Sequence, residues 1–199
     1  MTKRKRSGPP LKFMALIVFL PILGFGQQEE RFIDKESWRS EPIRILRLRT
    51  KDKDVELGKK FSEQDDWLKG LTITVQNVSE KAVARIEFRL SFPRPGGGSS
   101  PETAIYTAAM GYGKDPAYVS ANEVLKVVLP GETVEIKLRE ESLSIIKEDL
   151  EKLGYEQPIK HAQLMLRSAT FVDGSEWAGD EILYPNPNNP KQKFIPRFP

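Results

Sequence analysis

His161 is the only histidine of the chain, so the chemistry open to it depends on the partners that the fold supplies. Helical metal sites need two histidines on one face, and hydrolytic triads need a serine and a carboxylate beside the imidazole. In a strand, His161 would lie on the same face as Gln163 and Arg167, because even numbers of positions separate them. This predicts a polar residue on a solvated face. The sequence therefore predicts no metal ligand set and no catalytic residue. A Ser/Asp partnership created by folding stays open.

Adjacent carboxylates are the next candidates, because paired acids can act as acid/base groups or as calcium ligands. Calcium loops need a glycine and a late glutamate, and neither follows Asp52 and Asp54 at the required positions. The glycines at 96–98 lack the Lys-Ser/Thr pair of a phosphate-binding loop. We therefore predict no cofactor and interpret the acidic pairs as solvated surface. These pairs are Asp65-Asp66, Glu140-Glu141 and Glu148-Asp149.

Three tyrosines offer a possible binding surface. Tyr106, Tyr112 and Tyr118 lie around Gly111 and Gly113, between two clear pairs of predicted strands. Tyrosines on the loops of a rigid sandwich supply large contact area at little cost in rotamer entropy. The alternative is that they seal the edge of the sandwich, with their hydroxyls in water. The tryptophans are interpreted as packing residues, with Trp177 the expected core member among Trp38, Trp67 and Trp177.

The N-terminal segment has the build of an export signal. Lys3–Arg6 provide a basic start, and Phe13–Phe25 is almost wholly apolar. Gly24 and Gly26 are the small residues that a signal peptidase needs for a cut before Gln27. The sequence thus predicts a cleaved signal peptide at residues 1–26 and an exported protein, periplasmic or extracellular.

The rival interpretation of this segment is an uncleaved membrane anchor. A spanning helix needs roughly 20 apolar residues. The apolar run here is shorter, and Pro21 and Gly24 interrupt it. The chain has no cysteine, which excludes lipid attachment at a lipoprotein cysteine, disulfides and thiol catalysis. If the signal is removed, we expect no stable membrane anchor.

Cleavage would also change the charge balance. The chain has 31 Lys and Arg against 28 Asp and Glu, and five of the basic residues but none of the acidic ones precede Gln27. The remaining 173 residues would carry a net charge of −2, and their number suits one domain. A nucleic-acid partner requires a basic surface on the mature domain, so we predict no nucleic-acid binding.

Alternating hydrophobicity gives the clearest structural signal. Apolar residues at every second position from Leu71 to Val75 and from Ala84 to Phe92 predict two strands with one solvated face. The turn at 77–81 makes them a hairpin candidate, and the alternative is that they lie in opposite sheets. A change of face inside Ile43–Arg49 predicts a strand with a bulge or a switch between sheets.

One helix and several further strands complete the prediction. Ser142 is the expected N-cap of a helix at 142–153, and Gly154 ends it. The apolar stripe of this helix must pack on the sheets, because so short a helix is not stable alone. Residues 50–66 are expected to be a charged connection. Further strands are expected at 103–110, 124–129, 134–138 and 159–172.

Two stretches of the chain carry a family resemblance. They are LTITVQNVSEKAVARIEF at 71–88 and VLPGETVEI at 128–136, where two apolar strands around an Asn-centred turn are followed by a Pro-Gly-Glu turn. This order resembles immunoglobulin-like modules of exported bacterial proteins, over about residues 43–184. The resemblance implies a two-layer sandwich and brings no catalytic residues with it. The disulfide of antibody domains is absent here, and the helix is an addition to the simple sandwich.

The prediction is thus a mostly β protein, an antiparallel two-layer immunoglobulin-like sandwich with one short α-helix at about 142–153. Its divisions are a signal at 1–26, a flexible arm at 27–40, the sandwich at 41–184 and a Pro-rich extended tail at 185–199. The expected function is a non-enzymatic exported module that binds a protein, a glycan or another envelope component. The alternative is a small exported hydrolase whose site assembles from distant residues.

Mass spectrometry of the protein recovered from a bacterial host tests the export prediction. We expect the mature chain to begin at Gln27, because Gly24 and Gly26 fit the two small-residue pockets of a signal peptidase. A protein that still begins before Gln27 would contradict cleavage and would favour the tethered form.

Overall fold

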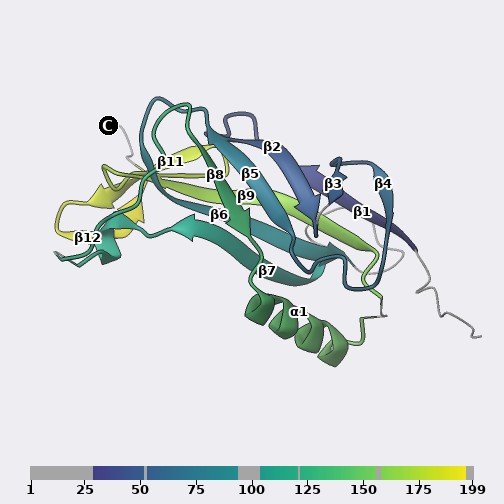
Figure 1. Cartoon of the computed structure of the whole chain (residues 1–199). Coiled ribbons are helices and arrows are strands. Elements are labelled where there is room, and N and C mark those ends of the chain that lie inside the picture. Colours follow the sequence, from purple (N-terminus) through teal and green to yellow (C-terminus); the bar gives the residue numbers. More distant parts are fainter. Residues whose placement is uncertain (1–28, 52, 94–103, 121, 156–157, 196–199) are drawn as a thin grey trace, which may run out of the picture.

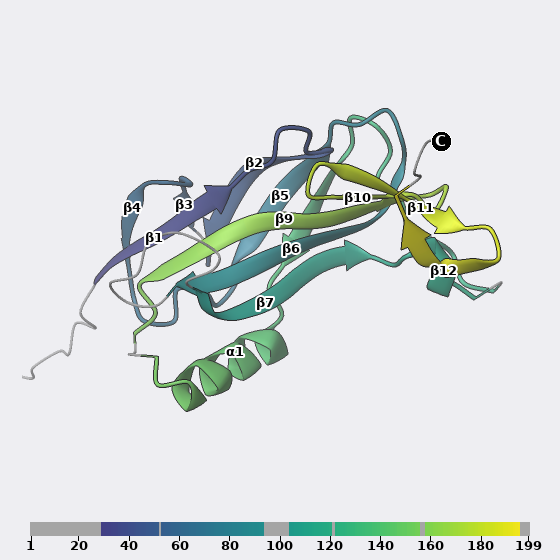
Figure 2. The same cartoon turned by 180° about the vertical axis from the view of Figure 1, so that it is seen from behind.

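Two β-sheets and one α-helix, α1 (Glu140–Lys152), form most of the described part of the chain. The computed structural model describes residues 29–51, 53–93, 104–120, 122–155 and 158–195. The sheets pack against each other, and α1 lies along one side of them (Figure 1 and Figure 2). The predicted mostly β fold with one short helix is confirmed. The predicted signal peptide and most of the Pro/Gly-rich loop at 93–101 lie outside the described residues.

The larger sheet has eight strands. They are β1 (Glu29–Glu36), β4 (Lys60–Glu63), β6 (Val83–Pro93), β7 (Ala104–Gly113), β9 (His161–Phe171), β10 (Glu176–Ala178), β11 (Glu181–Asn186) and β12 (Asn189–Phe194). One edge of β9 pairs antiparallel with β6, and β6 pairs in turn with β7. The other edge of β9 pairs with β1 along its first half and with β10 along its second half. The sheet departs from the expected antiparallel arrangement at one place, because β1 runs parallel to β9.

The smaller sheet has four strands. In spatial order they are β3 (Lys53–Val55), β2 (Ile43–Thr50), β5 (Thr72–Asn77) and β8 (Thr133–Lys137). The register of β2 on β5 shifts between Ile45 and Arg47, where Leu46 is half exposed, so the predicted bulge is confirmed. Since β5 belongs to this sheet and β6 to the larger one, the predicted hairpin is wrong and the alternative of opposite sheets is right.

The core lies between the two sheets. Ile73 and Val75 of β5 are fully buried, as are Phe88 and Leu90 of β6. Their period-2 spacing directs these side chains to the inner faces of the sheets. Burying each side chain of this kind contributes about 1.5–3 kcal/mol to the stability of the fold. The alternation that predicted the two strands therefore also predicted which residues would fill the space between the sheets.

Two of the three tryptophans are core residues. Trp177, the expected core member, is buried. Trp67 is buried as well, and its indole N–H donates to the Ile159 carbonyl at 2.6 Å, which satisfies its polar atom. Trp38 is half exposed, and its ring lies beside Gly179.

The remaining predicted strands have mixed outcomes. The strands expected at 103–110, 134–138 and 159–172 correspond to β7, β8 and β9. The strand expected at 124–129 reduces to a single bridge between Val128 and Val83. The connection at 50–66 contains the short strands β3 and β4 as well as charged turns.

Helix α1 lies beside β7, at the edge of the larger sheet (Figure 2). It begins at Glu140 with Arg139 as N-cap, so the prediction of Ser142 as N-cap is wrong. Glu140 and Glu141 in the first turn interact favourably with the helix dipole. Gly154 has a φ of 71°, a left-handed conformation that favours glycine, and it ends the helix as predicted. The buried stripe consists of Leu143, Ile146 and Leu150.

The N-terminal arm is part of the larger sheet. The prediction of a flexible arm at 27–40 is wrong over Glu29–Glu36, because these residues form β1 between β9 and β4. Ile33 is buried, and Arg31 is fully buried with its guanidinium 3.2 Å from Glu29 and 2.7 Å from Asp65. The strand is mostly charged, so hydrophobic alternation could not reveal it.

The C-terminal segment is also part of the sheet. The prediction of an extended Pro-rich tail at 185–199 is wrong where β11 and β12 form an antiparallel hairpin. β11 pairs with β10, so the hairpin continues the larger sheet beyond β9. Residues 196–199 lie outside the described part.

A buried lysine fastens this hairpin. The side chain of Lys193 is only 10% exposed, and its Nζ lies 2.6 Å from the carboxylates of both Asp115 and Glu176. Asp115 also accepts the Ala117 N–H at 2.9 Å and so caps the short 3-10 helix η2 (Pro116–Tyr118). The end of the chain is thereby tied to the segment that follows β7.

Replacing Lys193 with methionine tests this fastening. The variant leaves two nearby carboxylates without their cation, so we expect the free energy of unfolding in urea to fall by about 3 kcal/mol. Lys191→Met is the matched control, because its exposed ammonium lies 5.1 Å from the Tyr118 ring centre and such contacts contribute less than about 1 kcal/mol. Equal losses in both variants would contradict a structural role for Lys193.

Candidate functional site

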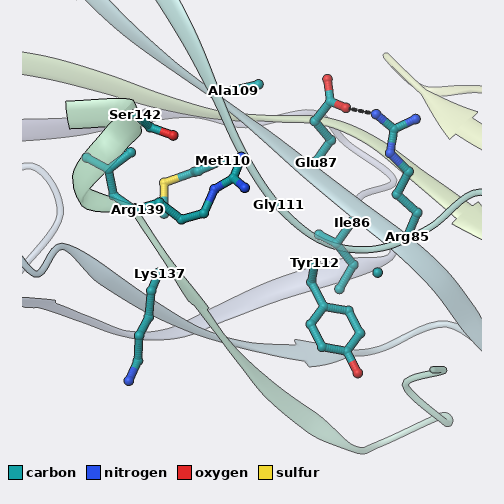
Figure 3. Close-up of a pocket in the computed structure, with 12 residues that line it drawn as sticks. Arg85, Ile86, Glu87, Ala109, Met110, Gly111, Tyr112, Lys137, Arg139 and Ser142 are labelled. Carbon is teal, nitrogen blue, oxygen red and sulfur yellow. Dashed lines mark hydrogen bonds and ion pairs between the residues drawn. The ribbon is translucent and has the colours of Figure 1, made fainter. Parts of the chain in front are cut away.

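A groove opens where the edge of β7 in the larger sheet approaches β8 of the smaller sheet (Figure 3). Its volume is about 370 Å³. The β7 side is formed by the segment 109–113, the β8 side by the segment 137–139, and Ser142 of α1 closes one end. The groove therefore joins two strand edges that belong to different sheets.

The β7 edge in this groove is unpaired and uncharged. In the described part of the chain, β7 pairs with β6 alone, and its sequence AIYTAAMGYG contains no charged residue and no proline. The Lys114 N–H donates to the Ala84 carbonyl at 3.2 Å. Because hydrogen-bonded pairs alternate in an antiparallel ladder, the N–H and C=O groups of Ala109 and Gly111 point away from β6.

Two glycines keep the chain close to β6. A Cβ atom on Gly111 would lie 2.6 Å from the Ile86 carbonyl oxygen. Gly113 has a φ of 74°, and a Cβ there would overlap the Ala84 carbonyl oxygen. Only glycine fits at these positions, so the groove floor at this end of β7 consists of bare backbone.

The charged groups around the groove leave a basic rim. Glu87 is buried and accepts from Arg85 (Figure 3), and it also accepts from Arg167 at 2.7 Å, so its charge is compensated twice. Lys137 lies 3.9 Å from the exposed Glu135, a weak contact in water. Arg139 forms no ion pair with any residue that the structure describes, and Figure 3 shows its side chain reaching toward the β7 backbone.

The single histidine lies at a different cleft, of about 660 Å³, at the start of β1 and β9. His161 Nε2 is 3.3 Å from Asp34 Oδ2, and the ring contacts Phe32 with centroids 5.0 Å apart. Nε2 is buried and makes no hydrogen bond, and no serine hydroxyl in the described part of the chain bonds to His161. His161 is 28% exposed, so it lies on a less solvated face than the sequence predicted.

The three tyrosines do not converge. Tyr106 and Tyr112 are half-buried on β7, and their six-residue separation corresponds to about 20 Å of strand. Tyr106 stacks on Phe92, and burial together with a hydrogen bond to Asp149 raises the pKa of the Tyr106 hydroxyl. Tyr118 is 61% exposed in η2. Of the three, Tyr112 lines the groove, and a binding role for the set stays a prediction.

The acidic pairs are ion-paired groups near the surface. Asp66 accepts a hydrogen bond from Lys51 at 2.6 Å, which holds the pKa of its carboxyl below the ordinary value. Glu148 lies 2.9 Å from Lys152 within one helix. The described residues contain no group of three ligands that could hold a metal ion. They also contain no helix long and apolar enough to cross a membrane.

Comparison with known proteins identifies no family. No family matches the sequence, and no curated protein matches it either. A solved structure that is similar is a 1.85 Å X-ray structure of a hypothetical protein from Peptoclostridium difficile 630. The two chains are 14% identical, the match covers 70% of this chain and 87% of that chain, and the TM-score is 0.35.

Of the groove residues, only Tyr112 was predicted to belong to a possible binding surface. Arg139 was expected only to be one of the polar residues that alternate along the strand at 134–138, and Gly111 and Gly113 were expected only to lie among the tyrosines. The uncharged sequence of β7 was the available signal, because exposed edge strands usually carry charge or proline. The His161 contact with Asp34 could not be predicted either, since β1 was expected to be a flexible arm.

Replacing Gly113 with alanine tests the strained end of β7. We expect a loss of at least 2 kcal/mol in the free energy of unfolding. The alanine methyl would overlap the Ala84 carbonyl oxygen, and the left-handed backbone conformation is itself unfavourable for alanine. Gly131→Ala is the matched control, since Gly131 has a φ of 80° with open space around it and should lose about 1 kcal/mol. Similar losses in urea unfolding would show that the approach to Ala84 is relaxed in solution.

Proposed function

We propose that this chain is an exported, non-enzymatic binding module with an immunoglobulin-like sandwich, and that it binds a protein of the cell envelope at the β7 edge. The observation that carries the proposal is the unpaired, uncharged edge of β7 beside the groove. Exposed strand edges of this kind pair readily with another chain. The predicted signal peptide supports an envelope location, periplasmic or extracellular.

A protein partner fits the groove better than a glycan does. The outward N–H and C=O groups of Ala109 and Gly111 match the spacing of another peptide backbone. Glycan sites use aromatic rings as stacking platforms, and Tyr106, Tyr112 and Tyr118 are too far apart to form one together. The structure thus favours peptide recognition among the partner classes that the sequence left open.

Site-specific photo-crosslinking tests the proposal. A benzophenone amino acid at Ala109, which is exposed on β7, should crosslink the mature protein to a partner in envelope extract. The same group at Lys59, in the exposed turn before β4, is the control and should give no such product. Crosslinks of equal yield from both positions, or from neither, would overturn binding at β7.

One observation favours the alternative of a small hydrolase. His161 and Asp34 lie 3.3 Å apart beside the larger cleft, as a general base and its orienting carboxylate would. No nucleophile bonds to this pair in the described part of the chain, so the pair ranks second. Hydrolysis of p-nitrophenyl acetate by the mature protein that disappears in both His161→Ala and Asp34→Asn would favour this alternative.

A further inference from the structure

We propose that the ligand of the groove is an extended acidic peptide segment that adds to β7 as a new antiparallel or parallel strand. This inference rests on the proposed function and names the chemistry of the partner. The support comes from three features of the groove. These are its free backbone groups, its uncompensated basic side chains, and the helix that limits its length.

The backbone groups fix the conformation of the ligand. Ala109 and Gly111 direct their N–H and C=O groups outward, and no backbone hydrogen bond between described residues outside the ladders uses them. A chain that satisfies these groups must be extended, since alternate residues of a strand present them about 6.6 Å apart. The absence of a side chain at Gly111 lets such a backbone approach closely.

The side chains fix the charge of the ligand. Arg139 has no ion-pair partner among the described residues, and Lys137 has only the weak contact with Glu135. Both are exposed at the β8 side of the groove, across from the free edge of β7. The nearby acid Glu87 is compensated by two arginines, and Glu140 lies 3.6 Å from Lys69. Carboxylates on the added strand would therefore meet cations, whereas basic residues would be repelled.

The helix limits the length of the added strand. Asp149 of α1 interacts with the Tyr106 hydroxyl, so the helix lies beside the first half of β7. Ser142 lines the groove at the start of the helix. The free edge is thus confined to the segment from Ala109 to Gly113, which accommodates about four or five residues at 3.3 Å each.

The same features disfavour a second copy of this chain as the occupant. A symmetric pairing of two β7 edges would bring the basic rims of both copies together. The β7 sequence supplies no carboxylate to compensate them. Charge complementarity therefore selects an acidic segment from another protein over self-association.

Fluorescence anisotropy with defined peptides tests the inference. The probes are labelled eight-residue peptides of alternating Thr-Glu, alternating Thr-Lys, and Thr-Glu with every backbone nitrogen methylated. With mature protein of residues 27–199, we expect the Thr-Glu peptide to bind at least tenfold more tightly than either of the others. N-methylation keeps the carboxylates but removes the backbone donors, so it separates strand addition from charge attraction alone.

Charge reversals locate the site. The double variant Lys137→Glu and Arg139→Glu should bind the Thr-Glu peptide at least tenfold more weakly, because two favourable contacts become repulsive. Lys59→Glu is the control, since this exposed lysine lies in the turn between β3 and β4. Thermal unfolding of each variant checks that the fold is retained.

Each contrary result identifies a different failure. Equal binding of the methylated peptide would overturn strand addition, and equal weakening by Lys59→Glu would overturn this location. Concentration-dependent dimerisation that Arg139→Glu strengthens would make a second copy the occupant and overturn the inference. If no peptide binds while Ala109 still crosslinks specifically, the acidic-strand inference fails and the proposed function stands. If the Ala109 crosslink is also absent, both fail.

Discussion

The pairing of β6 with β9 is the interaction on which the rest of the structure depends. Each strand has eleven residues, and every second side chain of β6 from Ile86 to Phe92 is fully buried against the core. A long pair of this kind combines a continuous hydrogen-bonded ladder with a large apolar surface, which together offset the entropy of ordering the chain. β7 joins the free edge of β6, β1 and β10 join the free edge of β9, and the remaining strands of the larger sheet pair with β1, β10 or β11. β7 pairs with β6 on one side, and no described strand pairs with its other side, so β7 forms an edge of the sheet.

Strand edges in this protein are protected in different ways, and β7 is the exception. β3 and β4 are very short, β8 carries Glu135 and Lys137, and β12 carries Lys191 and Lys193. Short length and charge both discourage pairing with other chains. β7 is ten residues long and uncharged, and helix α1 protects only its first half. In our proposal, the basic rim beside the second half disfavours the addition of basic strands and favours acidic ones.

Buried charges fasten the two ends of the described chain to the sheet. Arg31 joins β1 to Asp65, in the segment that follows β4, and Lys193 joins β12 to Asp115 and Glu176. Both cations are almost fully removed from solvent, so each depends on carboxylates from distant parts of the sequence. Removing Lys193 would leave Asp115 and Glu176 largely buried without their cation, and removing Asp65 would take from the buried Arg31 its nearer carboxylate. This dependence makes the ends of the chain part of the cooperative fold.

The sequence by itself determined the elements whose apolar residues repeat at a regular period. β5, β6, β8 and the buried stripe of α1 follow directly from spacings of two and of three or four residues, because burial requires one apolar face. Only the tertiary structure decided the elements that long-range partners stabilise. β1 and β12 are too polar to be recognised locally, and their charged residues become acceptable only beside distant ions. The groove could not be predicted for the same reason. Arg139 and Gly111 line it from two different sheets, and only the packing of these sheets brings the two residues close together.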